Sequence, residues 1–198
     1  MPSSIISTSY CPPIIYFQNL NRYKSIYMEH KEHYPRHSIR NRTYIMGSNN
    51  VLILTVPIVR KHASKTLVEN IKIARNNWKK KHINSIQSAY GSSPFFIYYF
   101  EEIINIINKD HIFLMDLNYD LINYFLIELN ILKEFQKTKS YIKNYPTKYI
   151  DQRDNIKINR TSKTYQPFGY NNPIHNLSIM DLLFNLGPNA KEYIYPEK

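Results

Sequence analysis

The sequence predicts a single-domain α/β fold, and three observations support this. Its 198 residues suit one domain of ordinary size. A strand–helix–strand pattern and then a hairpin pattern open the chain, whereas helical spacing dominates the middle and returns near the C-terminus. We therefore expect one domain over residues 1–198. In it, the N-terminal β-α-β and hairpin strands form a mixed sheet, followed by a helix-rich middle and a C-terminal helix.

The first 30 residues have the order strand, helix, strand. Ser4–Ser9 is apolar and stops before two prolines, which suits the end of a strand. Proline is tolerated in the first turn of a helix, so Pro13–Tyr23 is expected to be helical. This order predicts a parallel pair, with Ile5–Ser7 beside Ile26–Met28, because parallel strands need a crossover connection.

The next segment has the pattern of a β-hairpin. Ile39–Met46 and Val51–Val59 are rich in β-branched and aromatic residues, and the turn-forming residues Gly47–Asn50 separate them. Asn70–Ala74 is a weaker candidate for one more strand. Much later, the polar and lysine-rich stretch Lys133–Lys163 is expected to hold loops with a strand or two.

Helical patterns fill the middle of the chain and return near its end. They cover Asn77–Tyr90, Pro94–Asn108, Asp116–Leu132 and Ser178–Leu186. In the second and third of these, apolar residues recur along one face. Ser93 followed by proline predicts a cap and first turn, and Gly187 followed by proline predicts the end of the last helix.

Composition excludes several classes of protein. The longest strongly apolar run, Val51–Val59, has nine residues, far below the roughly 20 that span a bilayer. The first basic residue is Arg22, so the start lacks the charged region of a signal peptide. The single cysteine, Cys11, forms no intramolecular disulfide, and four glycines leave no glycine-rich phosphate loop. We expect a soluble cytoplasmic protein without membrane insertion and without a cofactor.

The net charge of +11 has two explanations. Isoleucine, asparagine, lysine and tyrosine are abundant and have A/T-rich codons, and lysine outnumbers arginine 18 to 8. This indicates an AT-biased genome, as in reduced-genome, endosymbiont-like bacteria, which explains part of the excess without any partner. The excess is concentrated in Arg60–His82, which suits either a solvated helix face or a nucleic-acid surface with Trp78 as a stacking group.

Two polar clusters are candidate binding sites. His30–His37 holds three histidines, but no cysteine joins them and Pro35 breaks any helix that would align them, so we predict no metal site. Arg40-Asn41-Arg42 lies where a strand is expected to begin, which would place both guanidinium groups on one face. Such a pair suits phosphate or carboxylate, but surface pairing with glutamates is equally consistent with the sequence.

Ser178 and Asp181 have the spacing of a capping box. We predict that the Ser178 hydroxyl accepts a hydrogen bond from the Asp181 amide. A role for Asp181 as a general base is the alternative, because a helix N-terminus favours its ionised form.

The order of these motifs resembles the WbqC-like family, in the form common in Bacteroidetes. The resemblance runs from about Ile6 to Ile194, and its most specific block is Asn176–Pro188. The blocks are Tyr10–Phe17, Arg40–Arg42, Leu54–Ile58, Trp78–His82, Ser85–Tyr90, Ser93–Phe96, Tyr165–Phe168 and Asn176–Pro188. Cys11 and Ile39 depart from it, because the family usually has aromatic residues there. Pro35 and His37 also depart from it, because the family usually has glutamine and no proline in that stretch.

The family is associated with O-antigen and other surface-polysaccharide gene clusters. The resemblance implies transfer of an aminoacyl or acyl group to a nucleotide-linked amino sugar, and leaves open whether the protein is an enzyme. It implies substrate binding, of a nucleotide sugar or another anionic small molecule, by Arg40, Asn41, Arg42, Tyr165 and Gln166, and catalysis by His82 and Asp181. The alternatives are a basic nucleic-acid-binding domain without catalysis, or a scaffold. The oligomeric state is not predicted.

Overall fold

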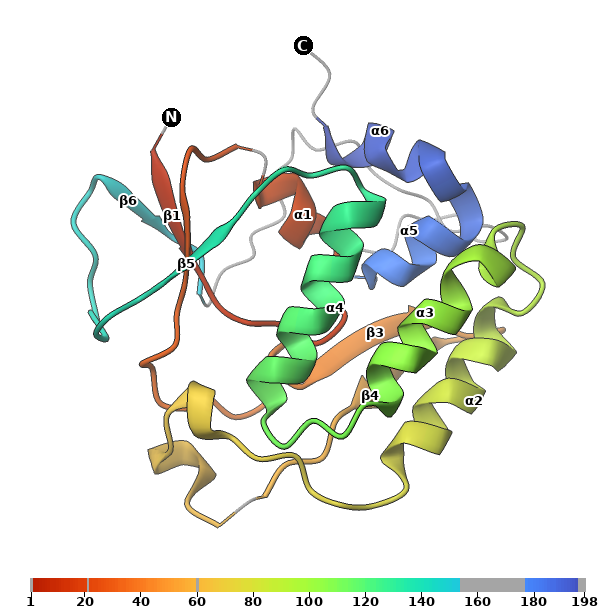
Figure 1. The fold of residues 1–198 in the computed structure, drawn as a ribbon, viewed down its shortest axis with the longest axis horizontal. Coiled ribbons are helices and arrows are strands. Elements are labelled where there is room, and N and C mark those ends of the chain that lie inside the picture. The colour runs from red at the N-terminus through yellow and green to blue at the C-terminus, as the bar shows by residue number, and fades with distance from the viewer. Residues whose placement is uncertain (1, 21, 60, 154–176, 196–198) are drawn as a thin grey trace.

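The computed structural model describes residues 2–20, 22–59, 61–153 and 177–195, and it has the predicted α/β class (Figure 1). Four short parallel strands form one sheet in the order β5-β2-β1-β6. They are β1 (Ser3–Ile6), β2 (Ile26–Met28), β5 (Phe135–Lys137) and β6 (Tyr149–Asp151). Helix α1 (Ile14–Leu20) connects β1 to β2, and Ile5 lies opposite Tyr27. The predicted parallel pair and its crossover helix are therefore confirmed.

The predicted hairpin forms, but as a sheet of its own. Strands β3 (Arg42–Met46) and β4 (Val51–Thr55) pair antiparallel, apart from the parallel sheet. The outer side of β3 is already in use, because the Ser178 amide donates a hydrogen bond to the Tyr44 carbonyl at 2.7 Å. The strands thus divide between two sheets instead of joining one mixed sheet, and Ser178, at the start of α5, occupies this side of β3.

Within the described residues five helices follow α1, and the first four of them match predicted segments. They are α2 (Trp78–Tyr90), α3 (Phe96–Asn108), α4 (Leu114–Glu128), α5 (Ile179–Leu186) and the short α6 (Lys191–Ile194). In Figure 1 the parallel sheet lies on the left and α2 and α3 lie on the right. None of the helices in the described ranges is long and apolar enough to cross a membrane.

Two local predictions were wrong. Asn70–Ala74 is not a strand: it contains the end of the 3₁₀ turn Val68–Asn70 and then only isolated bridges. Ser93 does not cap α3, because the hydroxyl of Ser93 donates to the Asn185 side chain at 3.1 Å instead. Tertiary contacts replace the local structure in both places.

The segment that follows β1 runs through the centre of the molecule. Every residue from Ser4 to Leu20 is buried, including all of α1. Cys11 lies in this segment, and burial raises the pKa of its thiol, so it packs as a small apolar side chain. Phe17 contacts Phe125 of α4 edge to face, which joins α1 to the helical layer. The buried apolar residues of strands and helices form one cluster.

Candidate functional site

The structure separates the two arginines that were expected to form a clamp. β3 begins at Arg42, so Arg40 lies before the strand and the two side chains do not share a strand face. The Arg40 side chain is only 2% exposed, and its Nε donates to Glu32 Oε1 at 2.7 Å. Its Nη2 is also 2.7 Å from that oxygen. The paired-face prediction was therefore wrong, because a buried carboxylate eight residues earlier binds Arg40.

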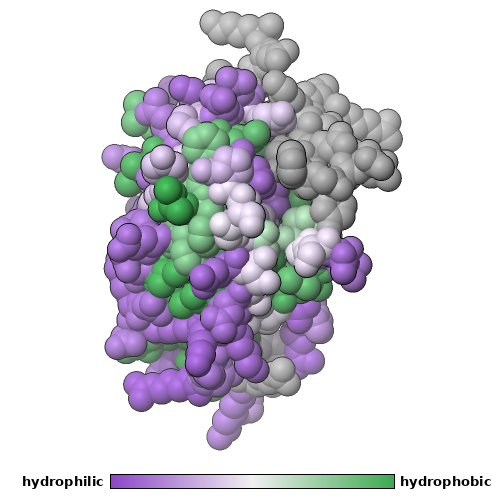
Figure 2. Space-filling model, turned by 90° about the vertical axis from the view of Figure 1, so that its right-hand side faces the viewer, coloured by the Kyte–Doolittle hydropathy of each residue, from purple (hydrophilic) through white to green (hydrophobic). Residues whose placement is uncertain are grey.

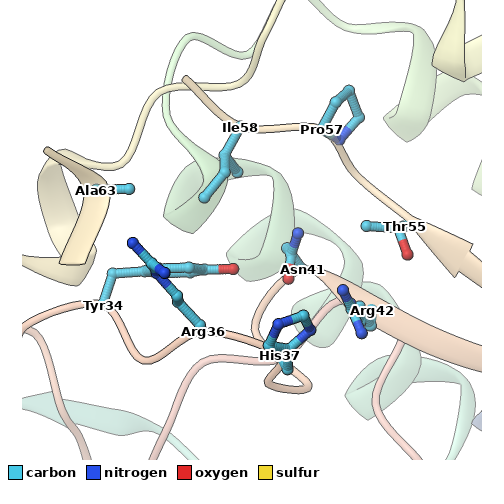
Figure 3. Close-up of a pocket in the computed structure, with 9 residues that line it drawn as sticks. All are labelled: Tyr34, Arg36, His37, Asn41, Arg42, Thr55, Pro57, Ile58 and Ala63. Atoms are coloured by element: carbon cyan, nitrogen blue, oxygen red, sulfur yellow. The ribbon is translucent and has the colours of Figure 1, made fainter. Parts of the chain in front are cut away.

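Arg42 and Asn41 line a pocket of about 440 Å³ (Figure 3). The chain from residue 34 to 42 forms one side, and the segment after β4 forms the opposite side. The described lining residues are Tyr34, Arg36, His37, Asn41, Arg42, Thr55, Pro57, Ile58 and Ala63. Asn41 ties the two sides together, because its Nδ2 donates to the Val56 carbonyl at 2.8 Å and its carbonyl accepts from the Val56 amide at 2.8 Å.

The pocket has the charge of an anion site. Arg36, His37 and Arg42 line it, and no carboxylate is among its described lining residues. Arg42 Nε is buried and has no hydrogen-bond partner in the described part of the chain. A buried donor without a partner is costly, so a ligand oxygen that accepts from it would gain a strong, charge-assisted bond.

His82 lies behind the pocket and not in it. Its ring is 5% exposed and contacts Trp78 edge to face, with ring centroids 5.0 Å apart. The Tyr10 hydroxyl is 2.9 Å from His82 Nδ1. Burial lowers the pKa of His82 to about 4, although a hydrogen bond with the backbone of Thr55, a pocket residue, opposes this. His82 is therefore neutral at pH 7, and its catalytic role stays a prediction.

We expect His82 to make the protein less stable in acid. Its imidazole takes up a proton at about pH 4 when folded, against an ordinary value near 6.5 when unfolded. The stabilisation is thus complete above pH 6.5 and is lost as the pH falls towards 4, by about 3 kcal/mol in total. Urea unfolding of wild type and His82→Gln between pH 4 and 7 measures this. Parallel stability curves for the two proteins would contradict it, because the other titrating groups are common to both.

Asp181 is a buried partner of another helix. The Ser178 hydroxyl begins α5 by accepting from the Met180 amide at 3.3 Å, so the predicted bond from the Asp181 amide was wrong. The Asp181 side chain is 1% exposed, and its Oδ2 accepts from the Tyr90 hydroxyl at 2.6 Å. That hydroxyl also accepts from the Met46 amide at 2.9 Å. Asp181 thus joins α5 to α2 and β3, and its catalytic role also stays a prediction.

Tyr165 and Gln166, the other two predicted substrate-binding residues, lie outside the described residues. The profile of the WbqC-like protein family matches residues 8–153 of the chain. The chain belongs to this family. Searches of curated proteins and of solved structures find no match. The family match covers the pocket residues and His82, whereas the C-terminal block that gave the most specific resemblance lies beyond it.

The basic stretch of this WbqC-like chain does not form a stacking surface around Trp78. Trp78 is buried against His82 and Tyr10 and is therefore not available to stack on a base. Lys79 Nζ donates to carbonyls at the end of α3, at 3.0 and 2.9 Å, whereas Lys80 and Lys81 are exposed. Seen from the side of α2 and α3, the described surface is mostly hydrophilic (Figure 2). Lys80 and Lys81 therefore lie on open surface, whereas Lys79 is partly buried and hydrogen-bonded.

Sequence reasoning missed most of the apolar and basic lining of the WbqC-like pocket. Pro57 and Ile58 were within a family-like block but were given no role. Arg36 and His37 were noted only as part of a histidine cluster. The charge on both sides of Pro35 was an available signal, but it could not show that this segment faces the end of β4. Among the described residues, no three histidine, cysteine or acidic side chains are placed to hold a metal ion.

Proposed function

We propose that this WbqC-like protein acts in surface-polysaccharide biosynthesis and binds the anionic part of a nucleotide-linked amino sugar in the Arg42 pocket. The observation that carries this proposal is the buried Arg42 Nε without a partner in the described structure. Arg36 and His37 add donors to the same pocket, and Pro57 and Ile58 add an apolar wall. A few polar groups in a mainly formed pocket of this size are typical of small-molecule sites.

The proposed reaction transfers an aminoacyl or acyl group to the amine of the sugar. The amine nitrogen attacks the acyl carbon, the bond from that carbon to the donor's leaving group breaks, and the amine loses a proton. His82 is the proposed proton acceptor, because its imidazole is neutral and is hydrogen-bonded to the backbone of Thr55, a pocket residue. Asp181 is the second proposed group, and its contact with Tyr90 makes it a candidate for positioning α5.

A thermal-shift screen tests the binding step. UDP-, dTDP- and GDP-linked amino sugars are compared with RNA and polyglutamate, because a ligand that binds only the folded state raises its melting temperature. The proposal expects a shift with at least one nucleotide sugar. A shift with RNA alone, steeply reduced by salt, would support the nucleic-acid interpretation instead.

Replacing Arg42 with methionine should weaken nucleotide-sugar binding about 10-fold to 150-fold, which is the range for one hydrogen bond to a charged group. Methionine keeps most of the apolar stem, so the fold should be retained. Titration calorimetry measures the affinity, with the exposed Lys80→Ala variant as the control that should match wild type. Equal weakening by both substitutions would indicate general charge attraction and contradict a specific site.

A further inference from the structure

The parallel sheet has a point at which its strand order reverses. The chain passes from β1 to β2 and on to β5 in one direction, and then places β6 on the opposite side of β1. In parallel sheets, ligands bind outside the carboxyl ends of the strands at such a reversal. Here the reversal lies between β1 and β6, so the residues that follow these two strands lie where a ligand would bind.

Several buried polar residues lie at this edge. Ser7 and Thr8 follow β1, and Arg153 follows β6. The guanidinium of Arg40 reaches the same edge, since its Nη2 is 3.5 Å from the Arg153 carbonyl oxygen. Asn118 of α4 arrives from the helical layer and donates to Thr8 Oγ1 at 3.1 Å.

Two atoms at this edge have no partner in the part of the chain that the structure describes. They are the Ser7 hydroxyl and Asn118 Oδ1, on side chains that are 1% and 0% exposed. The orientation of the Asn118 amide is fixed, because its Nδ2 donates both to Thr8 and to the Arg40 carbonyl at 2.8 Å. Its Oδ1 is therefore an acceptor held in place with nothing to accept from, which is costly in a folded protein.

This edge adjoins the Arg42 pocket. The Arg40 carbonyl that Asn118 binds belongs to the peptide unit leading into Asn41, a pocket residue. The Ser9 hydroxyl and the Tyr10 amide likewise bind the Ile39 carbonyl, at 3.3 and 3.0 Å. The loop after β1 therefore contacts the segment that forms one side of the pocket.

We infer that the edge between β1 and β6 is a second subsite, which takes a hydroxyl or amine of the sugar ring of a ligand whose anionic part lies at Arg42. This inference rests on the proposed function. Asn118 Oδ1 accepts but cannot donate, so it suits an O–H or N–H group and disfavours a phosphate oxygen. The Ser7 hydroxyl can do both, and sugar hydroxyls need both. Away from water these bonds are stronger than at the surface.

The experiment compares two matched serine variants of the same strand region. Ser7→Ala removes a hydroxyl without a described partner, so the melting temperature of the free protein should stay the same or rise. Ser4→Ala is the control, because Ser4 is equally buried but its hydroxyl donates to the Ile150 carbonyl at 3.1 Å. That variant should melt lower and bind every ligand as wild type does, after allowance for folding.

Calorimetry then measures the affinity for UDP, UDP-glucosamine and free D-glucosamine, with the dTDP and GDP pairs in parallel. Wild type should bind the amino-sugar form more tightly than the nucleotide alone. In Ser7→Ala the affinity for the amino-sugar form should fall about 2-fold to 13-fold, the range for one net hydrogen bond, and the affinity for the nucleotide should be unchanged. Arg42→Met should weaken both ligands equally.

The failures of the two proposals differ. The subsite alone is overturned if the protein binds the nucleotide and the amino-sugar form equally tightly. It is also overturned if the amino-sugar form binds more tightly but Ser7→Ala does not reduce that difference. Either result indicates that the two atoms hold only a buried water. Glucosamine binding that Ser7→Ala abolishes, without nucleotide binding, overturns the anion site and keeps the subsite. Binding of none of these probes overturns both.

Discussion

Replacing Arg40 with methionine should lower the free energy of unfolding by about 3–5 kcal/mol, the range for breaking a buried ion pair by removing one partner. The substitution leaves Glu32 buried without its guanidinium partner, whose Nε and Nη2 both lie 2.7 Å from Oε1. Burial raises the pKa of Glu32, and Arg40 opposes that effect. Without Arg40 we expect the carboxyl to bind a proton at higher pH. Urea unfolding at pH 7 measures the loss of stability.

A double variant separates the lost pair from lost packing. Arg40→Met combined with Glu32→Leu should recover most of the stability, because apolar side chains of similar volume replace buried ion pairs at little cost. A single variant that stays within about 1 kcal/mol of wild type would contradict a strongly stabilising pair between Arg40 and Glu32.

Replacing Gly187 with alanine should lower the free energy of unfolding by about 2–6 kcal/mol, from backbone strain and from overpacking together. Gly187 ends α5 with φ at 55° and ψ at −129°, a conformation that side chains other than glycine rarely adopt. A Cβ at this position would also lie 2.4 Å from the Phe95 ring, so the ring would have to move.

The Phe95→Ala background divides this cost into its two parts. There the ring is absent, and Gly187→Ala should retain only the backbone strain, roughly 1–3 kcal/mol. Thermal or urea unfolding of the four proteins forms a double-mutant cycle. A coupling energy near zero would show that Phe95 does not restrict this position.

Local patterns predicted elements that depend on local chemistry. The prolines after β1 and the turn residues before β4 restrict the local backbone conformation. The α1 crossover and the hairpin could therefore be predicted from the sequence. The strands β5 and β6 have three residues each in a polar stretch. Three residues are too few for an alternating pattern to predict the bounds of a strand. These strands form because they pair with the edges of β2 and β1.

For the predicted site residues, local spacing did not reveal which distant side chains they contact. Asp181 has the spacing of a capping box, but its carboxylate binds Tyr90, 91 residues earlier in the chain. Arg40 has the spacing of a clamp, but Glu32 binds it. Arg42 lines a pocket, and its neighbours leave its Nε without a described partner, which no pattern in the sequence could show. Its role in substrate binding stays a prediction.

The central place of β1 has a consequence for how the chain acquires its structure during synthesis. β2 leaves the ribosome soon after β1 and can then pair with it, but the partner of the other edge, β6, is synthesised much later, since Ser4 bonds Ile150 across 146 positions. At about 5–20 residues per second, that edge stays unpaired for roughly 7–30 s. A nascent chain paused before residue 149 would therefore present an apolar strand edge to chaperones or to other chains, and completion of β6 would end that exposure.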